Sequence, residues 1–110
     1  MAIVSHSVNI TYSLTLTLDA LASGYSYGFD IMEATGLPSG TVYPLLRRLE
    51  RQRLVVGRFE SETTAHSEGR PARRHYRLTA AGRAVLAKCR ERFGARPLDR
   101  IAGVTPRPAR

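Results

Sequence analysis

The clearest pattern of apolar and polar positions lies between residues 36 and 51. Four apolar residues recur there at i, i+3, i+4 and i+7, which is typical of a helix with one buried face. These residues are Val42, Leu45, Leu46 and Leu49. Ser39 is the predicted N-cap, because its hydroxyl oxygen can accept a hydrogen bond from a free amide of the first turn. The pattern predicts an amphipathic helix that is covered on one side only.

The opposite face of this helix gathers small, aromatic and basic residues, namely Gly40, Tyr43, Pro44, Arg47, Arg48 and Arg51. Guanidinium groups beside an aromatic ring are suited to contact phosphate groups or base edges. Proline lacks an amide hydrogen and crowds the carbonyl group four residues earlier. We therefore expect either a kink at Pro44 or a regular helix that begins there.

The pattern before this helix has two interpretations. Apolar residues alternate with Ser and Thr from Ile10 to Leu18, which is the period of a strand, whereas Leu14, Leu18 and Leu21 also fit helical spacing. Gly24 ends the element in either case, since glycine readily takes the left-handed conformation. A short helix is then expected over residues 27–35, with Ser26 as its cap and Gly36 as its stop. Together with the helix after Pro38 it has the length of a helix-turn-helix.

A hairpin is expected after the amphipathic helix. Residues 54–60 are rich in Val and Phe, and residues 74–78 alternate, so both segments predict strands. The connection between them, residues 61–72, is polar and punctuated by Gly and Pro, and it is expected to be a long loop. A hairpin with a long tip after such a helix is typical of a wing. Three basic residues, Arg70, Arg73 and Arg74, cluster on its returning side, where they would reach a phosphate backbone or a minor groove; the alternative is a solvated loop.

The last pattern of apolar positions predicts a helix over residues 80–93, capped by Thr79. Its apolar side contains Val85, Leu86, Cys89 and Phe93. A small fold leaves such a side partly uncovered, so we expect it to pair with a second copy of the chain. From residue 94 the composition shifts to Arg, Pro, Gly and Ala, which predicts a basic disordered tail over residues 94–110. Residues 1–10 have little pattern and are expected to form an arm.

Length and charge change this picture by indicating a partner. A chain of 110 residues is one small domain with a single core. Residues 1–46 contain no Lys or Arg and have a net charge of −3, whereas residues 47–110 contain all 17 basic residues and have a net charge of +11. This asymmetry favours a polyanion such as nucleic acid, or an anionic membrane surface, over a merely solvated basic surface.

Candidate catalytic and metal chemistry is weak. The three His residues are far apart and lack ligand spacing, and no phosphate loop, Ser/His/Asp set or pair of acids stands out. We expect no enzyme activity, no cofactor and no metal. The single cysteine, Cys89, excludes an intramolecular disulfide and is interpreted as a core or interface residue, with a redox sensor as the alternative. No apolar run has the length of a membrane span, and the N-terminus lacks a signal-peptide pattern, so we expect a cytoplasmic protein.

Three segments in this order resemble the PadR family of bacterial transcriptional regulators. Residues 24–31 read Gly-Tyr-Ser-Tyr-Gly-Phe-Asp-Ile, residues 39–50 read Ser-Gly-Thr-Val-Tyr-Pro-Leu-Leu-Arg-Arg-Leu-Glu, and residues 74–83 read Arg-His-Tyr-Arg-Leu-Thr-Ala-Ala-Gly-Arg. The middle segment is the most specific, and the resemblance covers roughly residues 11–90. It implies that the first element is a helix.

The fold that the resemblance implies is mainly α with a small β-hairpin (α+β), a winged helix-turn-helix over residues 11–78 with a C-terminal dimerisation helix over residues 79–93. The implied function is a dimeric DNA-binding regulator, usually a repressor that a small molecule or other signal releases. We assign DNA binding to Ser39, Gly40, Thr41, Tyr43, Pro44, Arg47, Arg48 and Arg51 of the recognition helix and to Arg70, Arg73 and Arg74 of the wing. We assign the dimer interface to Leu14, Leu18, Val85, Leu86, Cys89 and Phe93.

The chain departs from the family pattern in three ways. Family members commonly have Gly after the recognition helix, where this chain has Arg53. The sequence does not continue into the long C-terminal region of larger members, so we expect it to resemble the short branch of the family. Some short members bind flat aromatic drugs between tryptophans, and this chain has no Trp, so that binding mode does not carry over. The competing hypothesis is a winged-helix interaction module that binds nucleic acid only through charge.

Overall fold

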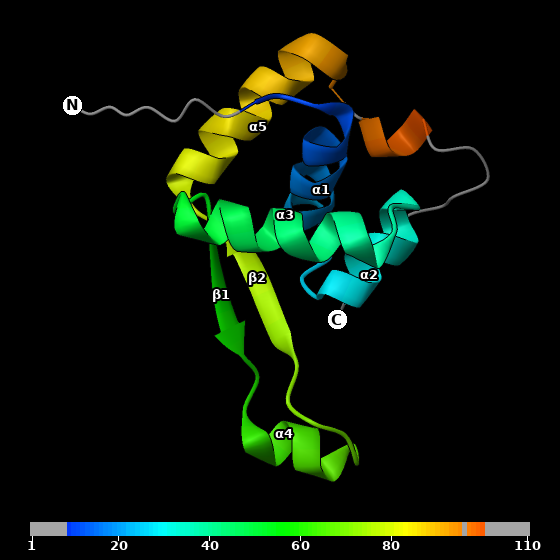
Figure 1. Ribbon diagram of the computed structural model, residues 1–110, viewed down its shortest axis with the longest axis vertical. Helices are drawn as coiled ribbons and strands as arrows, with labels where there is room; N and C mark the ends of the chain where they lie inside the picture. The colour runs from blue at the N-terminus through cyan, green and yellow to red at the C-terminus, as the bar shows by residue number, and fades with distance from the viewer. Residues whose placement is uncertain (1–8, 96, 101–110) are drawn as a thin grey trace.

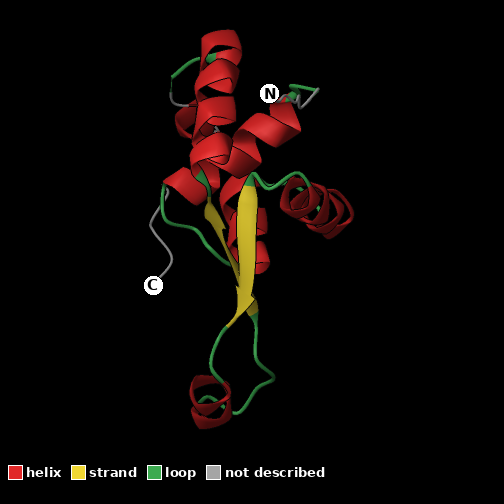
Figure 2. Ribbon diagram, turned by 90° about the vertical axis from the view of Figure 1, so that its left-hand side faces the viewer, coloured by secondary structure: helices red, strands yellow, loops and turns green. Residues whose placement is uncertain are grey.

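The computed structural model describes residues 9–95 and 97–100, which form helices stacked above a long two-stranded hairpin (Figure 1). The helix α3 crosses in front of α1, and α2 lies beside one end of α3. Seen from the side, the hairpin projects away from the helices and ends in a short helix at its tip (Figure 2). The elements are α1 (Tyr12–Ala22), α2 (Gly28–Thr35), α3 (Ser39–Arg51), β1 (Val55–Phe59), α4 (Glu62–Ser67), β2 (Arg74–Leu78), α5 (Ala80–Phe93) and the 3-10 helix η1 (Pro97–Arg100).

The first element is a helix, so the family resemblance gave the right choice and the strand-like alternation did not. Thr11 caps α1 by accepting a hydrogen bond from the Leu14 amide at 3.1 Å. Every residue from position 14 to position 20 is buried, and Thr15 and Thr17 are both 0% exposed. A helix that is buried all round has no polar face, and the alternation of Leu with Thr therefore carries no information about a sheet.

Both predicted serine caps of the helix-turn-helix are wrong. The N-cap of α2 is Tyr27 rather than Ser26, and the N-cap of α3 is Pro38 rather than Ser39, with no side-chain capping bond at either position. The prediction that Gly36 stops α2 is confirmed, since it has a φ of +78° and its amide donates to the Met32 carbonyl. The helix α3 continues through Pro44 rather than starting there. Gly40 and Pro44 are both exposed, so the missing helical hydrogen bond lies on the surface of the fold.

The predicted hairpin is confirmed. The strands β1 and β2 are antiparallel, with Gly57 opposite Tyr76 in the middle of the register. The segment before α2 extends this sheet, because the Tyr76 amide donates to the Ser26 carbonyl at 2.8 Å and Tyr27 forms a bridge with His75. The hairpin is therefore attached to the helix-turn-helix on the β2 side as well as through its connection to α3.

The tip of the hairpin is not the loop that the composition of residues 61–72 predicted. It contains α4, which Ser61 caps by accepting a hydrogen bond from the Thr64 amide at 3.1 Å. Ala65 is buried on the inner side of this helix, so even a six-residue helix here has a small apolar contact surface. The polar residues of this segment lie on the exposed side of α4, so its composition gave no sign of the buried contact.

The C-terminal part is also more ordered than predicted between residues 97 and 100. Thr79 caps α5 as expected, by accepting a hydrogen bond from the Gly82 amide. After α5 the chain turns back, and Leu98 of η1 is buried against α1. The carboxylate of Asp19 accepts hydrogen bonds from Arg90 at 2.6 Å and from the Leu98 amide at 3.2 Å, so one buried acid joins α1, α5 and η1. Residues 1–8 of the predicted arm and 101–110 of the predicted tail lie outside the described residues.

Candidate nucleic-acid interface

The two faces predicted for α3 are confirmed. Its apolar residues are buried in the core, namely Val42, Leu45, Leu46 and Leu49. The other face is exposed at Ser39, Gly40, Tyr43, Pro44, Arg47, Arg48 and Arg51 and partly exposed at Thr41. Among the described residues, none forms an ion pair with the three arginines of α3. This face therefore offers three free guanidinium groups to a partner.

The position of Tyr43 on this face is fixed by a contact that the sequence did not reveal. Its ring lies against Gly28 at the first turn of α2, and a Cβ atom at Gly28 would lie 2.4 Å from Tyr43 Cε1 and 2.9 Å from the hydroxyl oxygen. A distance below 3 Å is a steric overlap, so any side chain at position 28 would displace the Tyr43 ring from this place. The two motifs that share the family resemblance here, around positions 28 and 43, are thus the two sides of one contact.

The base of the wing is joined to α3 by an ion pair between Glu50 and Arg74. Both side chains are about one-third exposed. Gly57 of β1 lies beneath the pair, since a Cβ atom there would lie 2.8 Å from Arg74 Nε and 3.0 Å from Glu50 Oε2. The guanidinium of Arg74 also lies 5.2 Å from the centre of the exposed Phe59 ring. This contact fixes the hairpin relative to the last turn of the helix.

The tip of the wing is closed by an ion-pair network centred on Glu60. The Glu60 side chain is only 7% exposed, pairs with Arg70, and accepts a hydrogen bond from the Arg73 amide at 2.7 Å. Arg70 also pairs with Glu68 at 3.0 Å, and thus connects β1 with the end of α4. The hydrogen bond from Arg70, followed by the Arg73 amide, holds the pKa of Glu60 at about 2 against an ordinary 4.5.

Arg73 differs from its two neighbours in the wing. Its Nε lies 3.6 Å from Glu60, and its guanidinium carbon lies 4.0 Å above the Tyr27 ring, a cation–π contact with the residue that precedes α2. All three wing arginines that we predicted for DNA binding therefore have partners within the chain. Sequence reasoning missed Glu50 and Glu60 as partners of these arginines. The only signal for them was that one acid comes shortly before the first strand and the other directly after it, while the arginines come before or at the start of the second strand.

The residues predicted for a dimer interface fall into two groups. Leu14, Leu18, Leu86 and Cys89 are buried in the core of the single chain, where α5 packs on α1. Val85 and Phe93 remain partly exposed, and the Phe93 ring lies 5.5 Å from the ring of exposed Tyr12. Burial raises the pKa of the Cys89 thiol, which favours the unreactive protonated form. The surface left for a partner copy is thus narrower than predicted.

In the described ranges 9–95 and 97–100, no group of three or more His, Cys, Asp or Glu side chains is placed to hold a metal ion. None of the helices described here combines the length and the apolar character needed to span a bilayer.

Comparisons with known proteins agree with this architecture. The model of the "Transcriptional regulator PadR-like family" matches residues 17–88. No curated protein matches the chain. A PadR family transcription regulator from Clostridium difficile R20291 has 24% sequence identity and a TM-score of 0.65 over 76% of this chain and 88% of its own. A PadR family transcriptional regulator from Eggerthella lenta DSM 2243 has 26% identity and a TM-score of 0.60 over 73% and 70%.

A transcriptional regulator from Clostridium thermocellum is similar over a larger share of this chain, with 24% identity and a TM-score of 0.64 over 83% of this chain and 88% of its own. The fold of these proteins, the exposed arginine-rich face of α3 and the wing beside it agree with the sequence resemblance. The family model covers well over half of the chain. The protein therefore belongs to the PadR-like family of transcriptional regulators and has the winged helix with which this family binds DNA.

Proposed function

We propose that the protein is a sequence-specific repressor that binds an inverted-repeat operator as a homodimer and is released by a small molecule or other signal. The observation that carries this proposal is the exposed face of α3, where three arginines without an ion pair to any described residue lie beside a tyrosine held against Gly28. A recognition helix of this kind enters the major groove, and two of them in a dimer lie about 34 Å apart, one turn of DNA.

Each residue of this face has a proposed role. Arg47 makes a base contact, since a guanidinium group pairs in a bidentate manner with guanine. Tyr43 and the hydroxyl groups of Ser39 and Thr41 fix the register, and Gly40 and Pro44 allow close approach of the helix to the groove. Arg48 and Arg51 neutralise phosphates, and these contacts add affinity without sequence preference.

The wing is proposed to add contacts to the backbone or the minor groove through Arg70, Arg73 and Arg74. Their ion pairs leave donors free, because a guanidinium group has five N–H donors. The dimer is proposed to form through the α5 side of the fold, where Val85 and Phe93 are partly exposed next to Tyr12. Aromatic residues are enriched in the buried centres of such interfaces.

The proposal is tested by selecting bound duplexes from a random DNA pool at about 150 mM salt, a physiological ionic strength. The wild type should enrich an inverted repeat, and Arg47→Ala/Tyr43→Ala should not. The control is Lys88→Ala, which removes one exposed positive charge from α5. The sedimentation mass of the complex with the enriched duplex should correspond to two chains.

Two results would contradict the proposal. If the wild type binds the pool but enriches no sequence, the basic half of the chain is an electrostatic surface, and an interaction module that binds nucleic acid through charge becomes the better hypothesis. If a repeat is enriched but each duplex holds one chain, the dimer is wrong while sequence-specific binding stands.

A further inference from the structure

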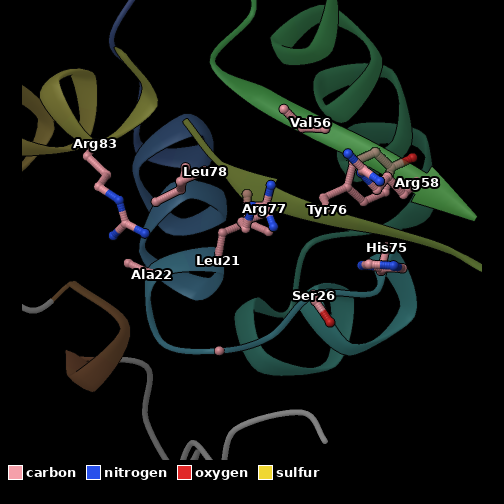
Figure 3. A pocket seen from close by; sticks show the side chains of 11 residues that line it. Leu21, Ala22, Ser26, Val56, Arg58, His75, Tyr76, Arg77, Leu78 and Arg83 are labelled. Carbon is pink, nitrogen blue, oxygen red and sulfur yellow. The ribbon is translucent and has the colours of Figure 1, made fainter. Parts of the chain in front are cut away.

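A pocket of about 250 Å³ lies on the side of the hairpin that faces away from α3 (Figure 3). The register pairs Val56 with Arg77 and Arg58 with His75, so these four residues share one face of the sheet. The opposite face carries Arg74 and Gly57 and contacts Glu50 of α3. The pocket is thus separated from the proposed DNA-binding face by the thickness of the sheet.

The walls of the pocket come from three parts of the fold. The hairpin forms one wall, the end of α1 and the turn after it form the second, and Arg83 from the first turns of α5 lies at the margin. In Figure 3, Arg83 lies at one end of the pocket beside Ala22, and His75 and Ser26 lie at the other. This volume lies just below the roughly 300–1,000 Å³ of ordinary ligand pockets, which suits a small organic molecule.

The charge of the pocket is strongly one-sided. Three guanidinium groups line it, those of Arg58, Arg77 and Arg83, and none of the lining residues is acidic. No ion pair joins these arginines to another residue in the described part of the chain, in contrast to the wing arginines. His75 and Ser26 add further polar groups at one end.

The apolar part of the pocket lies next to this charge. Leu21, Ala22, Val56 and Leu78 contribute to the lining, and Val56 is 37% exposed although it is a large apolar residue in a strand. Guanidinium groups bind phosphate oxygens with paired N–H donors, and three of them compensate a dianion better than a monoanion. The apolar lining would cover the organic part of the same ligand.

We propose that this pocket binds a small phosphate monoester, a dianionic phosphate group joined to a compact apolar body. A DNA backbone phosphate is a diester with one negative charge, and it has no apolar body to cover the lining at Leu21 and Val56. The pocket also joins the end of α1 to the hairpin, so an occupant would bias the position of the wing. The role of this pocket as the signal site of a repressor rests on the proposed function. The binding of a phosphate monoester to the pocket does not depend on that function.

The binding test uses the wild-type chain without DNA and follows backbone amide resonances during titration with phenyl phosphate. Phenyl phosphate should bind about tenfold more tightly than the monoanion benzoate, phenol should not bind measurably, and inorganic phosphate should bind more weakly because it lacks the apolar body. The shifted amides should be those of the pocket, such as Gly24, Ser26 and Val56. Shifts centred on Arg47, Arg48 and Arg51 would overturn the proposal, because the anion would then prefer the free arginines of α3.

Matched variants separate the pocket from bulk charge. Arg58→Gln/Arg77→Gln should weaken phenyl phosphate binding about tenfold or more, while Arg92→Gln should leave it within about twofold. Equal weakening in both variants, or none in either, would overturn the site. If phenyl phosphate does not bind and the double variant instead loses affinity for random duplex, the arginines contact the DNA backbone and the proposal is wrong.

The regulatory role is tested separately, by measuring affinity for the duplex that the wild type enriches. Phenyl phosphate should change the affinity for this duplex at least about threefold in the wild type and not in Arg58→Gln/Arg77→Gln, since a ligand shifts an equilibrium only by its differential affinity. An unchanged affinity with proven binding would remove the regulatory role. A failure to enrich any duplex concerns the proposed function alone, because the titration contains no DNA.

Discussion

The arginines of α3 and those of the wing are alike in the sequence and different in the structure. Arg47, Arg48 and Arg51 are exposed and have no acidic partner among the described residues. Arg70, Arg73 and Arg74 of the wing are held by Glu50, Glu60 and Glu68, and Arg73 also lies on the Tyr27 ring. The difference teaches that a basic cluster has two uses here, since one set of charges remains available to a partner while the other holds the wing in place.

The largest expected effect is that of Arg47→Ala. If Arg47 reads a guanine, its loss should cost about 1–3 kcal/mol of binding free energy on the enriched duplex, because a bidentate base contact discriminates by that amount. Titration of labelled duplexes that differ at single base pairs measures the loss. The preference at one base pair should relax together with the affinity.

The matched comparison for this variant is Arg70→Ala in the wing. It should weaken binding to all duplexes alike, since its guanidinium group holds the wing through ion pairs with Glu60 and Glu68 and is not proposed to read a base. Equal weakening on every duplex for Arg47→Ala as well would make Arg47 a phosphate contact and would remove the distinction between the two sets of arginines.

The pattern of apolar positions predicted some elements of this fold correctly and others not. The helical period gave the buried and exposed faces of α3 correctly, because that helix has solvent on one side and core on the other. The same reasoning failed at α1, where burial on all sides removes the period, and at α4, where a single buried Ala65 is too little to form one. Local periodicity predicts an element only when its two faces meet different surroundings.

The candidate site was predictable to the same extent. The face of α3 follows from spacing within one helix, so its residues were identified before the fold was known. The contacts Tyr43 with Gly28 and Glu50 with Arg74 join segments 15 and 24 residues apart, and only the packing of the chain brings them together. Four of the predicted dimer residues lie in the core of the single chain for a related reason, since an apolar stripe on α5 does not tell whether α1 or a second copy covers it.

The next largest effect concerns Arg53, the arginine between the two sets. It has a φ of +62° in the turn after α3, where the family commonly has Gly, and a left-handed conformation costs a residue with a side chain about 1–2 kcal/mol. Arg53→Gly should therefore raise the free energy of unfolding by about 0.5–1 kcal/mol, after the greater freedom of glycine in the unfolded chain is subtracted.

Chemical denaturation with urea measures this change. Arg53→Gln is the matched control, because it removes the charge and keeps the strained backbone, and it should give no stabilisation. If Arg53→Gln stabilises the chain as much as Arg53→Gly does, repulsion among the arginines is the cause, and Arg53 belongs electrostatically with the α3 set.

A smaller effect separates the two sets by salt dependence. Each protein charge that neutralises a phosphate contributes about 0.9 to the slope of log Kobs against log salt concentration. Arg51→Gln should lower this slope by about one, whereas Arg70→Gln should lower it by less, because Glu60 already compensates part of the Arg70 charge. Glu60→Gln should make the slope steeper, since it frees the guanidinium groups of Arg70 and Arg73. A lower slope for Arg70→Gln than for Arg51→Gln would mean that the wing exchanges its internal partners for DNA.

The smallest effect at neutral pH is the titration of the wing itself. The pKa of Glu60 is lowered from 4.5 to about 2, so the folded chain binds the proton less readily than the unfolded chain does. The contribution of this carboxylate to wing stability is therefore complete above about pH 5 and is lost as the pH falls from 4.5 towards 2. The Arg73 amide, which donates to Glu60 at 2.7 Å, should report this loss as a chemical-shift titration with a midpoint near 2. The titration should vanish in Glu60→Gln, and a midpoint near 4.5 in the wild type would show that the wing tip is open and its arginines are as free as those of α3.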